Sequence, residues 1–335
     1  MTMQKSNLKL VVIGGGTGSF NLLQNFKHSF NSITALVNMA DSGGSSGTLR
    51  DELGVLPPGD VRQCLVALSE APELRELFNY RFDQGGLQGH ALGNIFLSAL
   101  EKSTGSFSEA VKTASKILRI TGQVIPITTV DTHLVFLSSS NHLIKGESLI
   151  EHSDLSKEPR PALSLEPDAD IDPAAREALL NADVIVLAPG DLYSSLAPAL
   201  LVKGVGETLK MSKAKKIYVC NLVTKPKQTD GYDVDDFASE IERFIGSPVL
   251  DYVFYNNEVP TSNLLDKYTH DGEYLVKYQP DSRHERHYKV IGLPLIAKDI
   301  VQLRGGDPLV HSRSLIRHDP SLLVPEIVAI HENRY

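Results

Sequence analysis

Hydrophobic positions along this chain gather into short apolar runs that are separated by longer amphipathic stretches. Three runs rich in β-branched residues, at 8–13, 33–39 and 184–188, each lead into a turn and then into a helical pattern. Runs of this kind are typical of strands that are buried on both faces of a parallel sheet. Two more runs, at 217–220 and 252–255, have the same character.

Patterns with the period of a helix occupy the stretches between these runs. Helices are expected at 61–70, 92–101, 108–119, 173–181 and 199–211. Strands that alternate with helices in this way favour a doubly wound α/β fold with a mainly parallel sheet.

One region breaks the alternation. Between residues 124 and 152 the apolar positions predict short strands without intervening helices, which indicates a small antiparallel insert. The stretch 153–173 is acidic and holds four prolines, so it is interpreted as a surface connection. We therefore expect one α/β domain over residues 1–335, with an insert and connection at about 124–172.

Composition narrows the class of protein. The chain has 335 residues, of which 41% are hydrophobic and 22% are charged, as in an ordinary globular protein. Its two cysteines, Cys64 and Cys220, lie in apolar runs and are interpreted as buried thiols in a reducing compartment. The net charge of −8 argues against broad binding to nucleic acid or anionic membranes, because both depend on an excess of Lys and Arg.

No segment resembles an export signal or a membrane span. The apolar run that starts at Leu10 stops at Gly14, and no stretch approaches the ~18 apolar residues of a spanning helix. We expect a cytoplasmic protein without a membrane span. A homodimer is the default expectation, because symmetric dimers are the commonest soluble oligomers.

A glycine-rich turn follows the first predicted strand. It consists of Gly14, Gly15, Gly16, Thr17 and Gly18. Glycines let backbone N–H groups and a helix N-terminus approach a phosphate closely, where the helix dipole adds favourable charge. A helix is expected to start at Ser19, where the strict G-x-G-x-x-G fingerprint fails, so a nicotinamide dinucleotide is not specifically implied. A purely structural tight turn is the alternative.

A second glycine-rich segment follows the second predicted strand. It begins at Asp41, where related folds place a carboxylate that contacts a ribose hydroxyl, and a metal is the other role for this side chain. Three glycines and four hydroxyls follow within seven residues: Ser42, Gly43, Gly44, Ser45, Ser46, Gly47 and Thr48. Alone, this segment could be a flexible loop. Two such loops after consecutive parallel strands lie together at the topological switch point, and their pairing favours a phosphate site.

Charged residues follow the second loop. Arg50 and Arg62 suit the forked geometry with which guanidinium groups hold phosphate, although either could be an ordinary surface arginine. Asp60 ends a Leu-Pro-Pro-Gly-Asp turn and is interpreted as the N-cap of the helix expected from Val61. The functional alternative is a Mg²⁺ ion held by Asp41 and Asp60 together with phosphate oxygens.

Polar groups in the second half also follow predicted strands. Gly190 comes after the run 184–188, as the first glycine turn comes after its strand. Asn221 and Thr224 follow the next run and Asn257 the one after, and their amide and hydroxyl groups suit recognition of a base and a sugar.

His90 and Asn94 are spaced i, i+4, so they are expected to share a helix face. A lone histidine is more often structural than catalytic. No nucleophile elbow, P-loop or convincing Ser/His/Asp set occurs in the sequence.

Taken in order, these motifs resemble the YvcK (GlmR, gluconeogenesis factor) branch of the CofD-like family. The resemblance rests on the turn at 14–18, the Gly-Gly-Ser-Ser-Gly-x-Leu-Arg stretch at 43–50, the Leu-Pro-Pro-Gly-Asp-x-Arg turn at 56–62 and the Gly-Asn pair at 93–94. It implies a Rossmann-like sheet that binds a UDP-sugar, usually UDP-N-acetylglucosamine. It also implies a regulatory role that directs carbon towards cell-wall precursors and cell shape, with a protein partner in that synthesis.

CofD itself is a transferase, and this gives the alternative hypothesis. Members of the CofD branch transfer a phospholactyl group to a deazaflavin alcohol, and they use a guanine nucleotide and Mg²⁺. The resemblance places Asp41 and Asp60 where that metal chemistry occurs, and makes Arg317 a ligand contact near the C-terminus. In this hypothesis Arg50 or Arg62 stabilises the charge that develops on phosphate. No reaction is firmly implied.

The sequence departs from the family pattern in three places. Ser42 stands where a second Asp is usual, which removes a charge from any metal site in that loop. Asp191 stands where a neutral Ser is usual, and an added carboxylate would repel phosphates or recruit a cation. The segment 221–229 lacks the family's Gly and Glu and gains two lysines, one of them Lys225. The ligand could therefore differ from the family's usual one.

Overall fold

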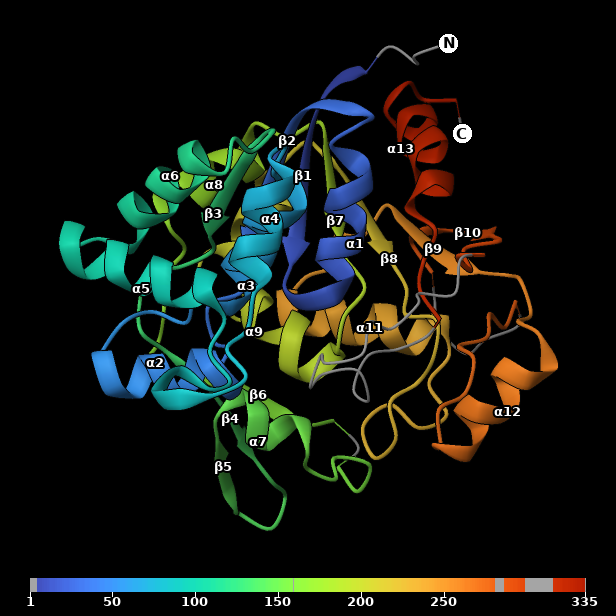
Figure 1. Cartoon of the computed structure of the whole chain (residues 1–335). Helices are drawn as coiled ribbons and strands as arrows, with labels where there is room; N and C mark the ends of the chain where they lie inside the picture. The colour runs from blue at the N-terminus through green and yellow to red at the C-terminus, as the bar shows by residue number, and fades with distance from the viewer. Residues whose placement is uncertain (1–4, 159, 281–285, 299–315, 335) are drawn as a thin grey trace.

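A seven-stranded sheet forms the centre of the computed structural model, which describes residues 5–158, 160–280, 286–298 and 316–334 (Figure 1). Its strand order is β10-β9-β8-β7-β1-β2-β3, and each recorded pair of neighbours is parallel. The strands are β1 (Ser6–Gly14), β2 (Phe30–Val37), β3 (Gln123–Pro126), β7 (Val184–Leu187), β8 (Lys215–Val219), β9 (Tyr252–Asn256) and β10 (Lys289–Leu293). The predicted mainly parallel sheet is confirmed.

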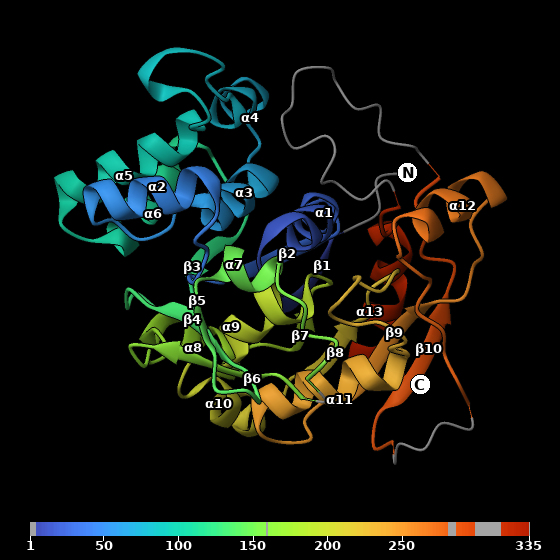
Figure 2. The ribbon, with the colours of Figure 1, turned by 90° about the horizontal axis from the view of Figure 1, so that it is seen from below.

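Helices cover both faces of this sheet, because the side chains of a buried strand alternate between two cores. Leu10 and Val12 of β1 pack in one core, and Val11 and Ile13 pack in the other. The first core is covered by α1 (Gly16–Phe26), α3 (Gly59–Leu68), α5 (Leu92–Thr104), α6 (Phe107–Ile117) and α13 (Leu323–His331). The second is covered by α8 (Pro173–Leu180), α9 (Ala197–Leu200), α10 (Val205–Met211) and α11 (Val234–Ile245). Figure 2 shows these two helical layers on opposite sides of the strands.

A small antiparallel sheet lies beyond the carboxyl edge of the large one (Figure 1). Its order is β5-β4-β6, with β4 (His133–Leu137), β5 (Leu143–Lys145) and β6 (Ala162–Glu166). The short helix α7 (Glu147–Glu151) follows β5.

Two strands differ from the prediction. β3 belongs to the large parallel sheet, where Thr34 of β2 pairs with Gln123, and not to an antiparallel insert. β6 lies in the stretch that was expected to be only a surface connection. Pro161 and Pro167 border β6, and strands at the edge of a sheet tolerate flanking prolines that an interior strand would not.

The helix expected at 199–211 is also broken. Gly204 has a φ of +89°, which interrupts the helical path between α9 and α10, and a π-helix at Leu192–Leu196 precedes α9. The remaining α-helices of the described residues are α2 (Gly44–Leu53), α4 (Pro72–Asn79) and α12 (Ser262–His270). None of the helices in the described part of the chain is long and apolar enough to cross a bilayer.

Candidate functional site

The strand order changes direction between β1 and β7, and the loops that leave these two strands pack against each other. Strands β2 and β3 extend the sheet on one side of β1, whereas β7 to β10 extend it on the other. A Cβ atom on Gly18 would lie 1.8 Å from the carbonyl oxygen of Pro189, so only glycine permits this contact. A ligand crevice is expected at such a switch point.

Gly190 and Asn221 hold one another at this edge. The Asn221 Nδ2 donates to the Gly190 carbonyl at 2.8 Å, and the Gly190 N–H donates to Asn221 Oδ1 at 3.4 Å. The amide group that was expected to recognise a base thus fixes the loop after β7 in this state of the protein.

The first glycine turn presents open backbone. Helix α1 begins at Gly16, not at Ser19 as expected. Gly16 has a φ of +62°, and among the described residues a Cβ there would meet only Asp60 Oδ1, at 4.0 Å. On Gly15, in contrast, a Cβ would lie 2.0 Å from Asp60 Oδ2. Gly15 therefore makes room for Asp60, while Gly16 and the exposed Thr17 face the open side of the turn.

Asp60 caps a different helix from the one expected. Helix α3 begins at Gly59 with Pro58 as its N-cap, so Asp60 lies inside the first turn and the predicted N-cap is wrong. Its Oδ1 accepts a hydrogen bond of 2.8 Å from the Gly16 N–H, the first amide of α1. The side chain thus joins the N-terminus of α3 to that of α1.

The second glycine segment is mostly the start of a helix. Only Ser42 and Gly43 remain as a loop after Asp41, because α2 begins at Gly44 and carries the following hydroxyls in its first turns. Asp41 Oδ1 accepts from the Gly43 N–H at 2.9 Å. A Cβ on Gly59 would lie 2.7 Å from Asp41 Oδ2. The N-termini of α1, α2 and α3 therefore meet around two carboxylates.

These carboxylates share their surroundings with a third, Glu147 of α7. Burial raises the pKa of Asp41, and burial followed by the charge of Asp41 raises the pKa of Asp60 to about 7. Burial, and after it the charges of Asp41 and Glu151, raise the pKa of Glu147 to about 9. Sequence reasoning missed Glu147, because it lies in the insert, far along the chain from both glycine loops, and no motif marks it.

Helix α7 is tied to the glycine segment and to the loop after β8. The Ser148 N–H donates to Ser42 Oγ at 3.1 Å. The Lys225 ammonium lies 2.5 Å from Asp191 Oδ2 and 3.2 Å from Glu151 Oε1. Two of the departures from the family pattern thus form an ion pair with each other, Asp191 with Lys225. The cation that balances the added carboxylate is a side chain of this protein.

The two arginines are held by protein groups. Arg62 Nε donates to Asn94 Oδ1 at 2.9 Å, and Arg62 Nη1 donates to Asn79 Oδ1 at 2.6 Å. Arg50 is 4% exposed, donates to the Thr132 carbonyl at 2.7 Å and forms an ion pair with Asp131. The interpretation of Arg50 as an ordinary surface arginine is excluded by its burial.

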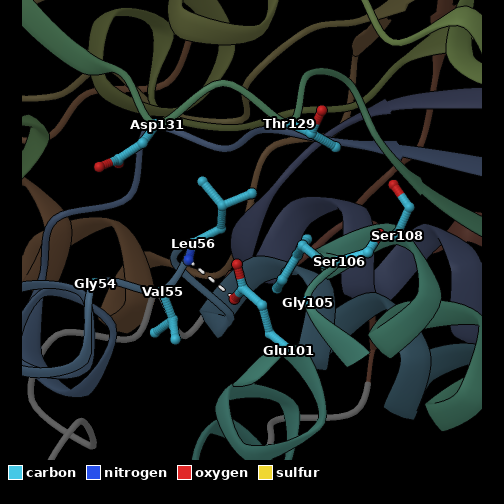
Figure 3. A pocket seen from close by; sticks show the side chains of 10 residues that line it. Gly54, Val55, Leu56, Glu101, Gly105, Ser106, Ser108, Thr129 and Asp131 are labelled. Atoms are coloured by element: carbon cyan, nitrogen blue, oxygen red, sulfur yellow. Dashed lines mark hydrogen bonds between the residues drawn. The ribbon is translucent and has the colours of Figure 1, made fainter. Parts of the chain in front are cut away.

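Asp131 also borders a polar pocket of about 380 Å³ (Figure 3). Glu101 lies in this pocket and accepts a hydrogen bond of 3.1 Å from the Leu56 N–H. The lining comes from residues 54–56, 101, 105–108, 129 and 131, none of which was a predicted site residue.

Asn94 and His90 meet at Ser45 rather than on a common helix face. Helix α5 begins at Leu92, so His90 lies before it and the predicted shared face is wrong. Asn94 Nδ2 donates to Ser45 Oγ at 3.1 Å, and His90 Nδ1 lies 3.0 Å from the same oxygen.

The remaining predicted residues lie further along the carboxyl edge. Thr224 is buried, and its Oγ1 accepts from the Tyr274 N–H at 3.1 Å. Asn257 is exposed just after β9. Arg317 precedes His318, whose ring bonds the Cys220 carbonyl at the end of β8.

The predicted metal ligands fit a cation by charge but form no complete cage. Asp41 and Asp60 each keep one carboxylate oxygen that accepts no backbone N–H among the described residues, and burial is the main reason why the pKa of each is raised. Among the described residues, no group of three or more His, Cys, Asp or Glu side chains is placed to hold a metal ion. Any Mg²⁺ here would need oxygens from a ligand or water. Cys64 and Cys220 are buried and free, as predicted.

The fold and this edge define an α/β protein in which the N-termini of three helices meet at the switch point of a parallel sheet. The family model for CofD, 2-phospho-L-lactate transferase, matches residues 10–300, and the chain belongs to the CofD-like family, in its gluconeogenesis factor (YvcK) branch.

The relatives support this placement over nearly the whole chain. The gluconeogenesis factor of Halalkalibacterium halodurans is 38% identical and covers 94% of this chain and 95% of its own length. That of Bacillus subtilis is 36% identical and covers 93% and 94%. A crystal structure of a UPF0052 family protein from Bacillus halodurans matches with a TM-score of 0.86 at 34% identity, over 97% of this chain and 100% of the other.

Proposed function

We propose that this protein binds a nucleotide sugar of the UDP-N-acetylglucosamine type and acts in the cytoplasm as a regulatory protein that links carbon metabolism to cell-wall precursor synthesis and cell shape. The relatives are named gluconeogenesis factors. The proposal for the ligand rests on the site itself.

One observation carries it: the N-termini of three helices of ten or eleven residues meet at the switch point. The link from Gly16 of α1 to Asp60 of α3, and the contact of Gly59 with Asp41 beside α2, place these helix ends together. Each helix N-terminus carries positive partial charge and N–H groups that have no partner within the helix, so together they favour the diphosphate of a nucleotide. The open side of Gly16 leaves room for it.

Calorimetric titration tests the proposal. UDP-N-acetylglucosamine, GDP and NAD are each titrated into the protein with and without Mg²⁺. We expect metal-independent binding of the UDP-sugar and, by mass spectrometry, its recovery unchanged. Failure of the UDP-sugar to bind at millimolar concentration would refute the proposal.

A second candidate function is a Mg²⁺-dependent transferase of a phosphorus-containing group, favoured by the crowded carboxylates Asp41 and Asp60. A bound Mg²⁺ would supply charge stabilisation to a transferring phosphorus group. The two aspartates would hold it, and Asp60 would at the same time orient the first amide of α1. Incubation with a guanine-nucleotide-linked phospholactate donor and a deazaflavin alcohol tests this reading. Product that requires Mg²⁺, and that disappears in Asp60→Asn, would favour the transferase.

A further inference from the structure

A hydrogen-bonded chain of four side chains passes through the first turn of α2 and consists of Arg62, Asn94, Ser45 and His90. Arg62 Nε donates to Asn94 Oδ1 at 2.9 Å. Because a guanidinium group has donors only, this bond fixes which end of the Asn94 amide is the oxygen. The Nδ2 end must then be the donor that reaches Ser45 Oγ at 3.1 Å. Asn94 is 3% exposed, so water does not compete for this arrangement.

Because Asn94 donates to Ser45 Oγ, the hydroxyl proton of Ser45 must go to another group. His90 Nδ1 lies 3.0 Å from Ser45 Oγ. An imidazole with its proton on Nε2 accepts the Ser45 hydroxyl proton. An imidazole with its proton on Nδ1 instead donates to Ser45 Oγ, and the hydroxyl proton is then free to bond a third group.

His90 is held firmly enough for this role. It ends a tight hairpin in which the Phe82 N–H donates to the His90 carbonyl at 3.0 Å and the Gly89 N–H donates to the Phe82 carbonyl at 2.8 Å. Arg81 and Ala91 form a bridge across the same hairpin. The segment 81–91 therefore brings a ring nitrogen to the glycine segment without belonging to α2 or α5.

We propose that His90 is a positioning residue of the anion site, which holds the Ser45 hydroxyl when the site is empty and releases it when an anion binds. This inference rests on the proposed function and deepens it. Phosphate and carboxylate oxygens accept hydrogen bonds, so Ser45 serves them only if its proton is free. Moving the imidazole proton to Nδ1 frees it and still leaves Ser45, Asn94 and His90 hydrogen-bonded to one another, which avoids the cost of an unpaired buried group. The chemical class that this position takes is thus an acceptor-only group, such as a phosphate oxygen.

Nitrogen-15 NMR of the ring of His90 tests the proposal directly. Spectra are recorded with and without saturating pyrophosphate, the acceptor-only part of the nucleotide, and then with UDP-N-acetylglucosamine. We expect the Nδ1 resonance to move from the range of an unprotonated ring nitrogen to that of a protonated one. An unchanged protonation pattern at saturation would overturn the proposal.

Matched variants supply a second measurement. In His90→Asn an amide replaces Nδ1 and can turn either its oxygen or its nitrogen to Ser45, whereas in His90→Gln the amide is displaced towards the Nε2 position. We expect His90→Asn to keep pyrophosphate affinity within about twofold, and His90→Gln to lower it roughly threefold to tenfold, as for the loss of one neutral hydrogen bond. In a Ser45→Ala background both changes should have no effect.

The outcomes separate this inference from the proposed function. If pyrophosphate binds and the UDP-sugar does not, the proposed ligand is refuted. The NMR measurement with pyrophosphate then still decides the role of His90. An equal loss for His90→Gln with and without Ser45 would show that His90 does not act through Ser45. Failure to bind either probe would overturn both proposals.

Discussion

Replacing Glu147 by glutamine should make the protein more stable at neutral and alkaline pH. Glu147 lies on α7, and burial together with the charges of Asp41 and Glu151 raises its pKa to about 9. In the unfolded chain the same carboxyl ionises near its ordinary value of 4.5. Between these two values the folded protein holds a proton that the unfolded chain releases, so stability falls as pH rises through this window.

The size of the effect follows from the same two values. At pH 7 the carboxyl of Glu147 stays protonated in the folded protein, whereas the unfolded chain is ionised, because pH 7 lies 2.5 pH units above 4.5. This difference lowers the free energy of unfolding by about 3.4 kcal/mol, at 1.36 kcal/mol per unit. Because Glu147 is partly accessible to water and its neighbours can relax, we expect about 1 to 3 kcal/mol in practice. Well below pH 4.5 both states are protonated and this contribution vanishes.

Urea denaturation from pH 5 to pH 8.5 measures the effect. The stability of Glu147→Gln relative to the wild type should be smallest near pH 5 and should grow with pH. Glu76→Gln serves as the matched control, because Glu76 is exposed on α4 and the change removes a carboxyl group outside the buried carboxylate cluster. A pH-independent difference for Glu147→Gln, or a loss of stability at pH 8, would refute the reasoning.

Three further predictions concern other parts of the protein. Gly16→Ala should abolish nucleotide binding, because its methyl group enters the space beside the first amide of α1. The control Gly246→Ala is strained to a similar degree, at φ +77°, but has open space around it, so it should lose only about 1 kcal/mol of stability and bind normally. Titration measures the binding, and urea denaturation measures the stability. Lys225→Gln should lower the free energy of unfolding by about 0.5 to 1.5 kcal/mol, because it leaves Asp191 without its cation, and adding Asp191→Ser should restore most of this loss. Additive effects of the two changes in a double-mutant cycle would argue against coupling. His318 is buried and its pKa is lowered to about 4, so stability should fall as pH drops from 6.5 towards 4, and His318→Gln should show a weaker acid dependence in the same assay.

The fold could be predicted from the sequence because its strands are buried on both faces. Such strands appear as uninterrupted apolar runs, and five of the seven strands of the large sheet were expected from them. β3 and β10 were not placed in the sheet, since each lies at its edge, where only one neighbour contributes burial. Helix α11 was also missed, although Asp233 and Asp236 form a capping box at its start. This capping pair marks the start of the helix in the sequence.

The candidate site was only partly predictable, for a different physical reason. Residues next to glycines, such as Gly16 and Asp41, are marked by backbone requirements that a sequence records directly. Glu147 and Lys225 are marked by nothing local, because what brings them to the site is the packing of the insert against the sheet. Asp60 shows the limit most clearly: the sequence identified it as a cap, and only the structure shows which helix it caps.

The departures from the family pattern are explained by the position of α7. Ser42 accepts the hydrogen bond from the Ser148 N–H, and Lys225 joins Asp191 to Glu151. All of these contacts attach the same five-residue helix to the edge that carries the glycine turns. An aspartate at position 42 would add another carboxylate beside Glu147, and a neutral pair at 191 and 225 would leave Glu151 without a cation. The three departures therefore act on one element: Ser42 directly, and Asp191 and Lys225 through Glu151, connect α7 to the carboxyl edge of the sheet, and Lys225 balances the charge that Asp191 adds.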